Sequence, residues 1–375
     1  MKRTFLLALP AIFCIGITSV LYNFGPAFAQ TKDVKSEKQP APQASPTPVI
    51  VSPKGSPTPP KINDEDEIIK VDTELVNLNV RVIDRNNRPI NNLKQAEFKV
   101  FEDGVVQQIE FFSKSEVPTN YTLVIDNSGS LRPQIEQVIE AGKIIVDTNR
   151  PDDETSVIRF VSRDKISIEQ PFTANKVDLI DALDNLYIEG GQTAIIDAVY
   201  LAAERVSEYE KKRDGNDRKR RALVLVTDGE DRDSFYNEAQ LFELLRETDV
   251  QIYVIGFVND LSKERGFIRK SPQGKAKSFL ERLASETGGR AYFPAATSEL
   301  ARIATEIASE LRTQYSIGYI PSNDKNDGSF RNIKVVVDDG PNKTKRIAIT
   351  RAGRTAEGES TDPQLKMPNQ AAKEQ

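Results

Sequence analysis

The sequence predicts a doubly wound α/β fold with a mostly parallel sheet, inserted into a small β-sandwich. Residues 118–312 alternate near-continuous apolar runs with amphipathic helical patterns. Shorter stretches of alternating polar and apolar residues lie on both sides, in 68–117 and 313–352. Apolar runs indicate strands covered on both faces, whereas alternation indicates strands with one buried face. We therefore expect a continuous α/β domain and a second domain built from both flanks.

The central region has the strand–helix alternation of a doubly wound sheet. Near-continuous apolar runs predict strands over Tyr121–Ile125, Ala222–Val226 and Gln251–Phe257, and further strand candidates are Thr155–Val161, Lys165–Glu169 and Arg290–Phe293. Helical periodicity predicts helices over Gln134–Asp147, Lys176–Leu186, Thr193 to about Tyr209, Glu238–Glu247, Lys277–Glu286 and Ser298–Arg312.

Each flank has too few strands to close a core alone. In the first flank we expect a strand over Leu75–Val80 and a hairpin with arms Phe98–Phe101 and Val105–Phe112. In the second we expect strands over Gln314–Ile320, Arg331–Val337 and Arg346–Thr350. We predict that the two groups pair into one sandwich.

The N-terminus has the pattern of an export signal. Lys2 and Arg3 precede an apolar stretch that begins at Phe5, and Ala27-Phe28-Ala29 resembles a cleavage site. We expect a signal peptide over 1–29, with an uncleaved membrane anchor as the alternative. After cleavage the protein would have no membrane span and would be periplasmic or extracellular.

Two further segments lack the apolar residues that offset ordering entropy. Residues 30–67 are rich in proline and polar residues, and residues 353–375 are mainly polar. We predict a proline-rich disordered linker over the first and a disordered tail over the second.

Composition excludes several kinds of chemistry. The chain has no histidine, and its only cysteine is Cys14, so neither a Ser-His-Asp triad nor a His- or Cys-based zinc site can form. The formal net charge of −5 does not favour a nucleic-acid partner. Basic residues cluster around Lys211–Arg213 and Arg218–Arg221, which we interpret as a solvated connecting loop.

Three short segments carry the candidate chemistry. They are Asp126-Asn127-Ser128-Gly129-Ser130 at the end of the first central strand, Gly190-Gly191-Gln192-Thr193 before the third helix, and Thr227-Asp228-Gly229 at the end of the fourth strand. The first and fourth strands of a doubly wound sheet flank the point where such folds place ligands. Each segment alone has another explanation, because serine and threonine cap helices and aspartate closes turns. Their order after the expected strands favours one shared site.

Two carboxylates and three hydroxyls form a donor set for a hard cation. We expect Asp126, Ser128, Ser130, Thr193 and Asp228 to hold Mg²⁺ or Mn²⁺, with Ca²⁺ less suited. The acidic residues that follow, Glu230, Asp231 and Asp233, either tune the charge of the site or are merely exposed, and we favour exposure.

The three segments resemble the metal-ion-dependent adhesion site of the von Willebrand factor A family. The resemblance implies that the serines, and usually the threonine, contact the ion directly and that one or both aspartates act through water. Residues Val71 to Ile349 also resemble a bacterial secreted family called VWFA-related, with Glu97–Gly104 as the most similar stretch of the first flank.

The resemblance implies adhesion or protein binding, in which the carboxylate of a partner's Asp or Glu completes the coordination of the ion. We expect no enzymatic activity. Two alternatives stay open: a structural component of the cell envelope that is stabilised by the metal, and a metal-dependent hydrolase.

Overall fold

The computed structural model describes residues 75–114, 117–211, 219–261 and 271–356, all within one unit, Ile69–Gln375. The predicted signal peptide, the proline-rich linker and residues 357–375 of the predicted tail lie outside the described residues. In the part of the chain that is described, no helix is long and apolar enough to cross a membrane. The predictions for the two ends of the chain therefore stay predictions.

A six-stranded sheet forms the centre of the α/β region. Its order is β10-β9-β8-β5-β6-β7, and all neighbours are parallel except β6 and β7. The strands are β5 (Thr119–Asp126), β6 (Glu154–Phe160), β7 (Ile166–Thr173), β8 (Arg220–Thr227), β9 (Gln251–Gly256) and β10 (Arg290–Tyr292). Every residue of β5 and β9 is buried, as the apolar runs predicted.

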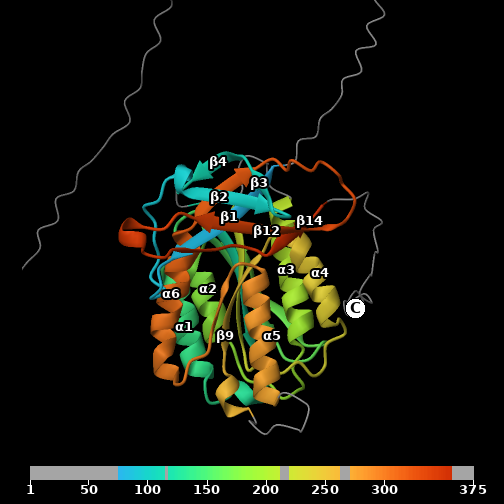
Figure 1. Cartoon of the computed structure of the whole chain (residues 1–375). Coiled ribbons are helices and arrows are strands. Elements are labelled where there is room, and N and C mark those ends of the chain that lie inside the picture. Colours follow the sequence, from blue (N-terminus) through green and yellow to red (C-terminus); the bar gives the residue numbers. More distant parts are fainter. Residues whose placement is uncertain (1–74, 115–116, 212–218, 262–270, 357–375) are drawn as a thin grey trace, which may run out of the picture. The chain divides into compact units, whose positions relative to one another are not determined.

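Helices cover both faces of this sheet (Figure 1). On one face lie α1 (Ile135–Asp147), α2 (Lys176–Asp184) and α6 (Leu300–Arg312), and on the other lie α3 (Ile195–Lys211), α4 (Glu238–Thr248) and α5 (Pro272–Glu286). Successive strand residues serve opposite cores: Leu123 packs with the first group and Val124 with the second. Each fully buried side chain of this size stabilises the fold by about 1.5–3 kcal/mol. The doubly wound prediction is confirmed.

Two four-stranded antiparallel sheets form the sandwich, with orders β13-β1-β11-β4 and β14-β12-β2-β3. The strands are β1 (Val76–Ile83), β2 (Phe98–Glu102), β3 (Val105–Gln107), β4 (Ile109–Ser113), β11 (Tyr315–Tyr319), β12 (Phe330–Val337), β13 (Ile347–Ile349) and β14 (Gly353–Thr355). Single turns of 3-10 helix are η1 (Gln95–Glu97), η2 (Gly129–Leu131), η3 (Val258–Asp260), η4 (Thr297–Glu299) and η5 (Pro341–Lys343).

Each sandwich sheet contains strands from both flanks. β1 pairs with β11, and β2 pairs with β12. Leu78, Phe98 and Tyr315 meet in a core shared by the two sheets. The predicted insertion of the α/β region into one sandwich is therefore confirmed.

The sandwich differs from the prediction at two points. The expected second arm of the hairpin, Val105–Phe112, divides into β3 and β4, which belong to different sheets. Alternation in the sequence cannot reveal such a change of sheet, because it indicates which side chains are buried and not which strand is the neighbour.

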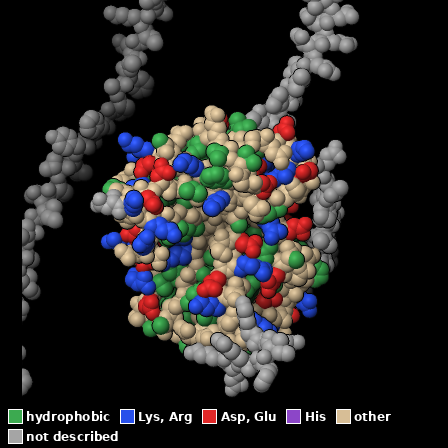
Figure 2. Space-filling model, viewed as in Figure 1, with side chains coloured by type: hydrophobic (Ala, Val, Ile, Leu, Met, Phe, Trp, Pro, Cys, Tyr) green, Lys and Arg blue, Asp and Glu red, His purple; other side chains and the backbone are tan. Residues whose placement is uncertain are grey.

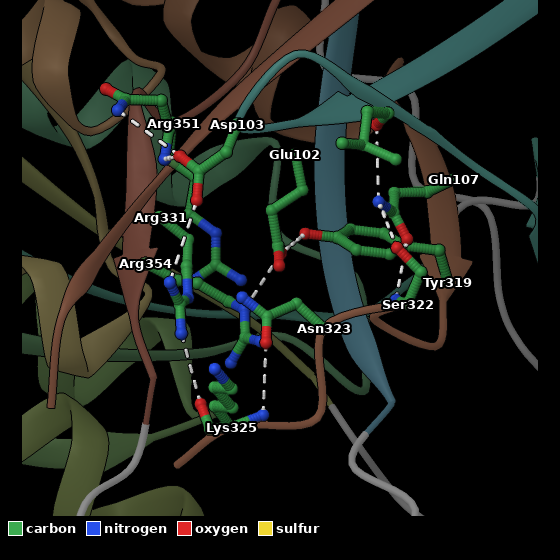
Figure 3. A network of polar contacts seen from close by, with 12 residues as sticks. Glu102, Asp103, Gln107, Tyr319, Ser322, Asn323, Lys325, Arg331, Arg351 and Arg354 are labelled. Carbon is green, nitrogen blue, oxygen red and sulfur yellow. Dashed lines mark hydrogen bonds and ion pairs between the residues drawn. The ribbon is translucent and has the colours of Figure 1, made fainter. Parts of the chain in front are cut away.

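The other difference lies at the end of the sandwich. Gly353, where the disordered tail was predicted to start, begins β14, which pairs with β12 (Figure 1). The buried Arg354 donates from Nε to Glu102 Oε2 over 3.1 Å, and the Tyr319 hydroxyl donates to the same carboxylate (Figure 3). This buried pairing orders a segment whose composition is polar.

The amino ends of the central strands meet the sandwich at a buried arginine. Arg220 is 4% exposed; it donates to the Gln314 carbonyl over 2.8 Å, the Leu311 carbonyl over 3.2 Å and Asn79 Oδ1 over 3.2 Å. Arg220 was predicted to lie in a solvated loop, and that prediction was wrong for this residue. A run of four basic residues predicts a solvated loop. In the structure, however, Arg220 binds carbonyl groups at the end of α6.

A second buried group joins α6 to the sandwich. Glu310 pairs with Arg81 of β1, accepts from Arg290 Nη1 over 2.8 Å and accepts from the Tyr292 hydroxyl over 3.3 Å. Arg81 and Glu310 are almost fully buried. We refer to Arg81, Arg220, Arg290 and Glu310 as the junction network.

Candidate metal centre

The three predicted segments lie at the carboxyl end of the central sheet. β5 and β8 are neighbours, and their register aligns Ile125 with Val226. Because the strands are parallel, the loops that follow them leave the sheet side by side. The strand order places the topological switch point between these two strands, where doubly wound sheets bind ligands.

The first segment brings its polar groups together. Ser128 N donates to Asp126 Oδ1 over 2.9 Å, and the hydroxyls of Ser128 and Ser130 are 3.0 Å apart. Ser128 precedes η2, but its side chain makes no capping hydrogen bond, and the residue that precedes α1 is Gln134. The capping explanation for the two serines is therefore wrong.

The two aspartates are buried without a basic partner. Asp126 is 0% exposed and Asp228 is 5% exposed. Asp126 Oδ2 accepts from the Thr227 hydroxyl over 2.8 Å, and Asp228 Oδ1 accepts from Glu230 N over 3.0 Å. Within the described ranges neither carboxylate forms an ion pair with lysine or arginine. Burial, together with the negative charge of Asp228, raises the pKa of Asp126 to about 6.

Thr193, in the second segment, bonds through its backbone to the loop that contains the third segment. It is 5% exposed, and its carbonyl accepts from Arg232 N over 2.8 Å and Asp233 N over 3.2 Å. The amide of Ile196, which a threonine cap at position 193 would bind, donates instead to Asp231 Oδ1 over 3.1 Å. Thr193 therefore does not cap α3 through its side chain, which was the alternative to its role as a metal ligand.

Glycines allow these loops to approach the sheet. A Cβ at Gly191 would lie 2.6 Å from Val161 Cγ1. Gly229 has a φ of +83°, and a Cβ there would lie 2.8 Å from Leu280 Cδ1. Both positions exclude larger residues, which explains the glycines of the second and third segments.

Asn127 joins the first segment to the second, a role that the sequence did not reveal. Its Nδ2 donates to the Tyr187 carbonyl, and its own carbonyl accepts from Glu189 N, both over 2.8 Å. Asn127 is fully buried. In the sequence, only the position of Asn127 between the predicted ligands Asp126 and Ser128 could have indicated a role at the site.

The acidic residues after Asp228 are not merely exposed, contrary to the favoured prediction. Asp231 is partly buried and accepts from the Ser234 hydroxyl over 2.5 Å as well as from Ile196 N. Asp233 Oδ2 accepts from Arg163 N over 3.3 Å. Both residues hold the loops together.

The donor set fits a hard divalent cation. Among the described residues, no group of three or more His, Cys, Asp or Glu side chains could hold a metal. A site here must combine the two carboxylates with hydroxyl groups, and the Ser128 and Ser130 hydroxyls already lie together. Oxygen donors of this kind suit Mg²⁺ and Mn²⁺.

Residues 120–306 match the model of a family described as the von Willebrand factor type A domain. The chain therefore carries a domain of this family, which we call the VWA domain. Domains of the family are typically metal-dependent protein-interaction modules, and their adhesion sites bind divalent cations.

An uncharacterized protein, sll0103, from Synechocystis sp. (strain ATCC 27184 / PCC 6803 / Kazusa) is 35% identical over 115 residues, which cover 30% of this chain and 26% of the relative. A solved von Willebrand factor type A protein from Catenulispora acidiphila is 13% identical, with a TM-score of 0.42, over 78% of this chain and 76% of that one. Proximal thread matrix protein 1 from the mussel byssus, solved with zinc in its metal-ion-dependent adhesion motif, is 18% identical, with a TM-score of 0.42, over 52% of this chain and 48% of that one.

Proposed function

We propose that this protein binds a divalent cation, Mg²⁺ or Mn²⁺, through Asp126, Ser128, Ser130, Thr193 and Asp228, and captures a carboxylate of a protein partner on it. One observation carries the proposal: two serine hydroxyls lie together beside the buried Asp126, which has no basic partner among the described residues. An isolated buried carboxylate is costly, and a cation would offset that cost.

The same donors explain why a partner's carboxylate would complete the site. Two carboxylates neutralise the formal charge of a dication but leave it short of six oxygen ligands even with three hydroxyls. The ion would keep one coordination position for an oxygen from outside, and a carboxylate is the strongest such donor. Ser130 is exposed, so this position would face solvent.

No broad basic surface competes with this interpretation on the face that Figure 2 shows, because Lys and Arg side chains there are mixed with Asp and Glu. The partner we propose is a protein that presents Asp or Glu, not a nucleic acid. We also propose that the protein is exported by its N-terminal signal and acts in the periplasm or outside the cell. N-terminal sequencing of the protein from its host would reveal cleavage after Ala29.

The metal step is tested by titrating the protein with Mg²⁺ and Mn²⁺ in a calorimeter. We expect one binding event that Asp126→Ala abolishes. Asp164→Ala is a matched control: it removes an exposed carboxylate, bonded to Ser162 Oγ over 2.6 Å, from a nearby loop. Equal binding by all three proteins would overturn the proposed site.

The partner step is tested by a pull-down from envelope and secreted fractions, with Mg²⁺ and with EDTA. A partner held only with metal, and lost in Asp126→Ala, would support carboxylate capture. If metal raises the melting temperature but changes no retained protein, the metal has a structural role and the binding proposal fails. Metal-dependent turnover of a substrate would favour the hydrolase alternative.

A further inference from the structure

The first turn of α3 receives its hydrogen bonds from a distant loop. The first amides of a helix have no partner within the helix. Here Ile196 N donates to Asp231 Oδ1 over 3.1 Å, and Asp197 N donates to Ser234 Oγ over 3.2 Å. Both acceptors belong to the loop between β8 and α4, which also contains Asp228. A carboxylate at this position also favours the positive end of the helix dipole.

The helix binds the loop in return. The carboxylate of Asp197 accepts from Phe235 N over 2.8 Å and from Tyr236 N over 2.9 Å, and it is 4% exposed. The rings of Tyr200 and Tyr236 stack with centroids 4.0 Å apart. We call the bonds of Asp197, Asp231 and Ser234 the loop clasp.

In both segments that it joins, the loop clasp uses a residue three positions after a proposed metal ligand. Thr193 precedes Ile196 by three positions, and Asp228 precedes Asp231 by three. Between them, the Thr193 carbonyl accepts from the amides of Arg232 and Asp233. Two ligands from distant parts of the chain therefore have their relative position fixed by bonds that use neither ligand's side chain.

An ordinary cap would not achieve this. A side chain at 192, 193 or 194 could bind the first amides of α3 and would stabilise the helix equally, but the β8–α4 loop would then be held less firmly. We propose that Asp231 is a positioning residue: it ties α3 to the β8–α4 loop and so holds Thr193 and Asp228 at the separation that the cation requires. This inference rests on the metal site of the proposed function.

The test compares Asp231→Ala with Asp231→Asn. Oδ1 of Asp231 accepts hydrogen bonds from both the Ile196 amide and the Ser234 hydroxyl. Asparagine keeps an oxygen at this position that can accept both bonds. We expect Asp231→Ala to weaken Mg²⁺ affinity roughly 10- to 100-fold, as loss of an outer-shell partner does in other metal sites. Asp231→Asn should restore affinity to within about threefold of the wild type.

Asn237→Ala is the matched control. Asn237 caps α4 from the same loop, and its Oδ1 accepts from Gln240 N over 3.1 Å, but it bonds no segment that contains a proposed ligand. It should lower the melting temperature as much as Asp231→Ala does, without changing Mg²⁺ affinity. If Asp231→Ala does not fold, Ser234→Ala removes the bonds of the Ser234 hydroxyl to Asp197 N and Asp231 Oδ1 but keeps the bond between Asp231 and Ile196 N, so it should give a smaller loss of affinity in the same direction.

The outcomes separate the two proposals. If the wild type binds Mg²⁺ and Asp231→Ala and Ser234→Ala bind it equally well, the positioning role is overturned and the metal site stands. If Asn237→Ala weakens binding as much as Asp231→Ala, the effect is general destabilisation and the inference is overturned. If the wild type binds neither Mg²⁺ nor Mn²⁺, the proposed function fails and this inference fails with it.

Discussion

Buried carboxylates have basic partners at one end of the central sheet and have none among the described residues at the other end. At the amino end, Glu310 has Arg81 and Arg290 as partners. At the carboxyl end, Asp126 and Asp228 are equally buried and have no basic partner among the described residues. One of the two basic partners of Glu310, Arg81, comes from strand β1 of the sandwich. A basic side chain neutralises the buried carboxylate where the sandwich attaches, whereas at the carboxyl end the proposed cation would have to do so.

The largest effect is expected from breaking the junction network. Glu310→Ala leaves Arg81 buried without its carboxylate, which should lower the free energy of unfolding by about 3–5 kcal/mol. Urea unfolding measures this loss. Glu281→Ala, which removes an exposed carboxylate of α5 that pairs only with the exposed Lys277 over 3.8 Å among the described residues, should change it by less than about 1 kcal/mol. Similar losses in both variants would show that the burial of Glu310 has no special weight.

Removal of a buried carboxylate at the carboxyl end of the central sheet should have the opposite effect on the stability of the metal-free protein. Asp126→Asn removes a buried charge that lacks a basic partner, so the metal-free protein should be as stable as the wild type or more so. The variant should also lose the stabilisation by Mg²⁺, about 2.7 kcal/mol when the free ion is at 100 times its dissociation constant. Thermal unfolding with and without Mg²⁺ measures both effects. A large destabilisation without metal would remove the contrast between the two ends.

Acid should weaken metal binding through Asp126. Burial raises its pKa from the ordinary 3.8 of an aspartate to about 6 in the fold, so the folded protein binds this proton more tightly than the unfolded chain. Metal-free stability contributed by this group therefore falls as the pH rises from about 4 to about 6, and is constant above that. Mg²⁺ competes with the proton, so its affinity should drop about tenfold for each pH unit below about 6.

Calorimetric titrations between pH 5 and 7 measure this slope. Differences in metal-free stability between the wild type and Asp126→Asn isolate the group from other carboxylates. An affinity that does not change with pH in this window would show that Asp126 is ionised before the metal binds.

The smallest effect is expected from Glu230, at the edge of the proposed metal site. Glu230 lies beside Asp228 and pairs with the exposed Arg232. Glu230→Gln should reduce Mg²⁺ affinity about twofold at low ionic strength, and the difference should disappear in high salt because exposed charges are screened. A loss as large as that of Asp126→Asn would place Glu230 among the ligands.

The sequence was sufficient for features that depend on local patterns. Apolar runs located the central strands, and each predicted helix has a counterpart. Helix starts were less certain: α5 begins at Pro272 instead of Lys277, because Ser271 caps it through Gly274 N at 3.1 Å. The proposed ligand positions also followed from local order along the chain, since parallel neighbours such as β5 and β8 end at the same edge.

The missing features all depend on residues that meet only in three dimensions. Arg220 lies in a basic run, and nothing in the local pattern of the sequence shows that it is buried. Arg354 lies in a polar segment and is ordered by Glu102, far away in the sequence. Asp231 caps a helix that starts before β8. Long-range polar partners have no periodicity, so no pattern in the sequence predicts them.

The interleaving of strands in the sandwich has a consequence for synthesis. Tyr319 and Glu102, which bond in the sandwich, are 217 positions apart. β1 to β4 leave the ribosome before the VWA domain and long before β11, β12 and β14. They cannot bury their apolar faces until those strands arrive, whereas the central sheet and the helices on its two faces all come from one continuous segment, residues 119–312. The VWA domain should therefore fold first and bring β1 and β11 together, so the sandwich closes last.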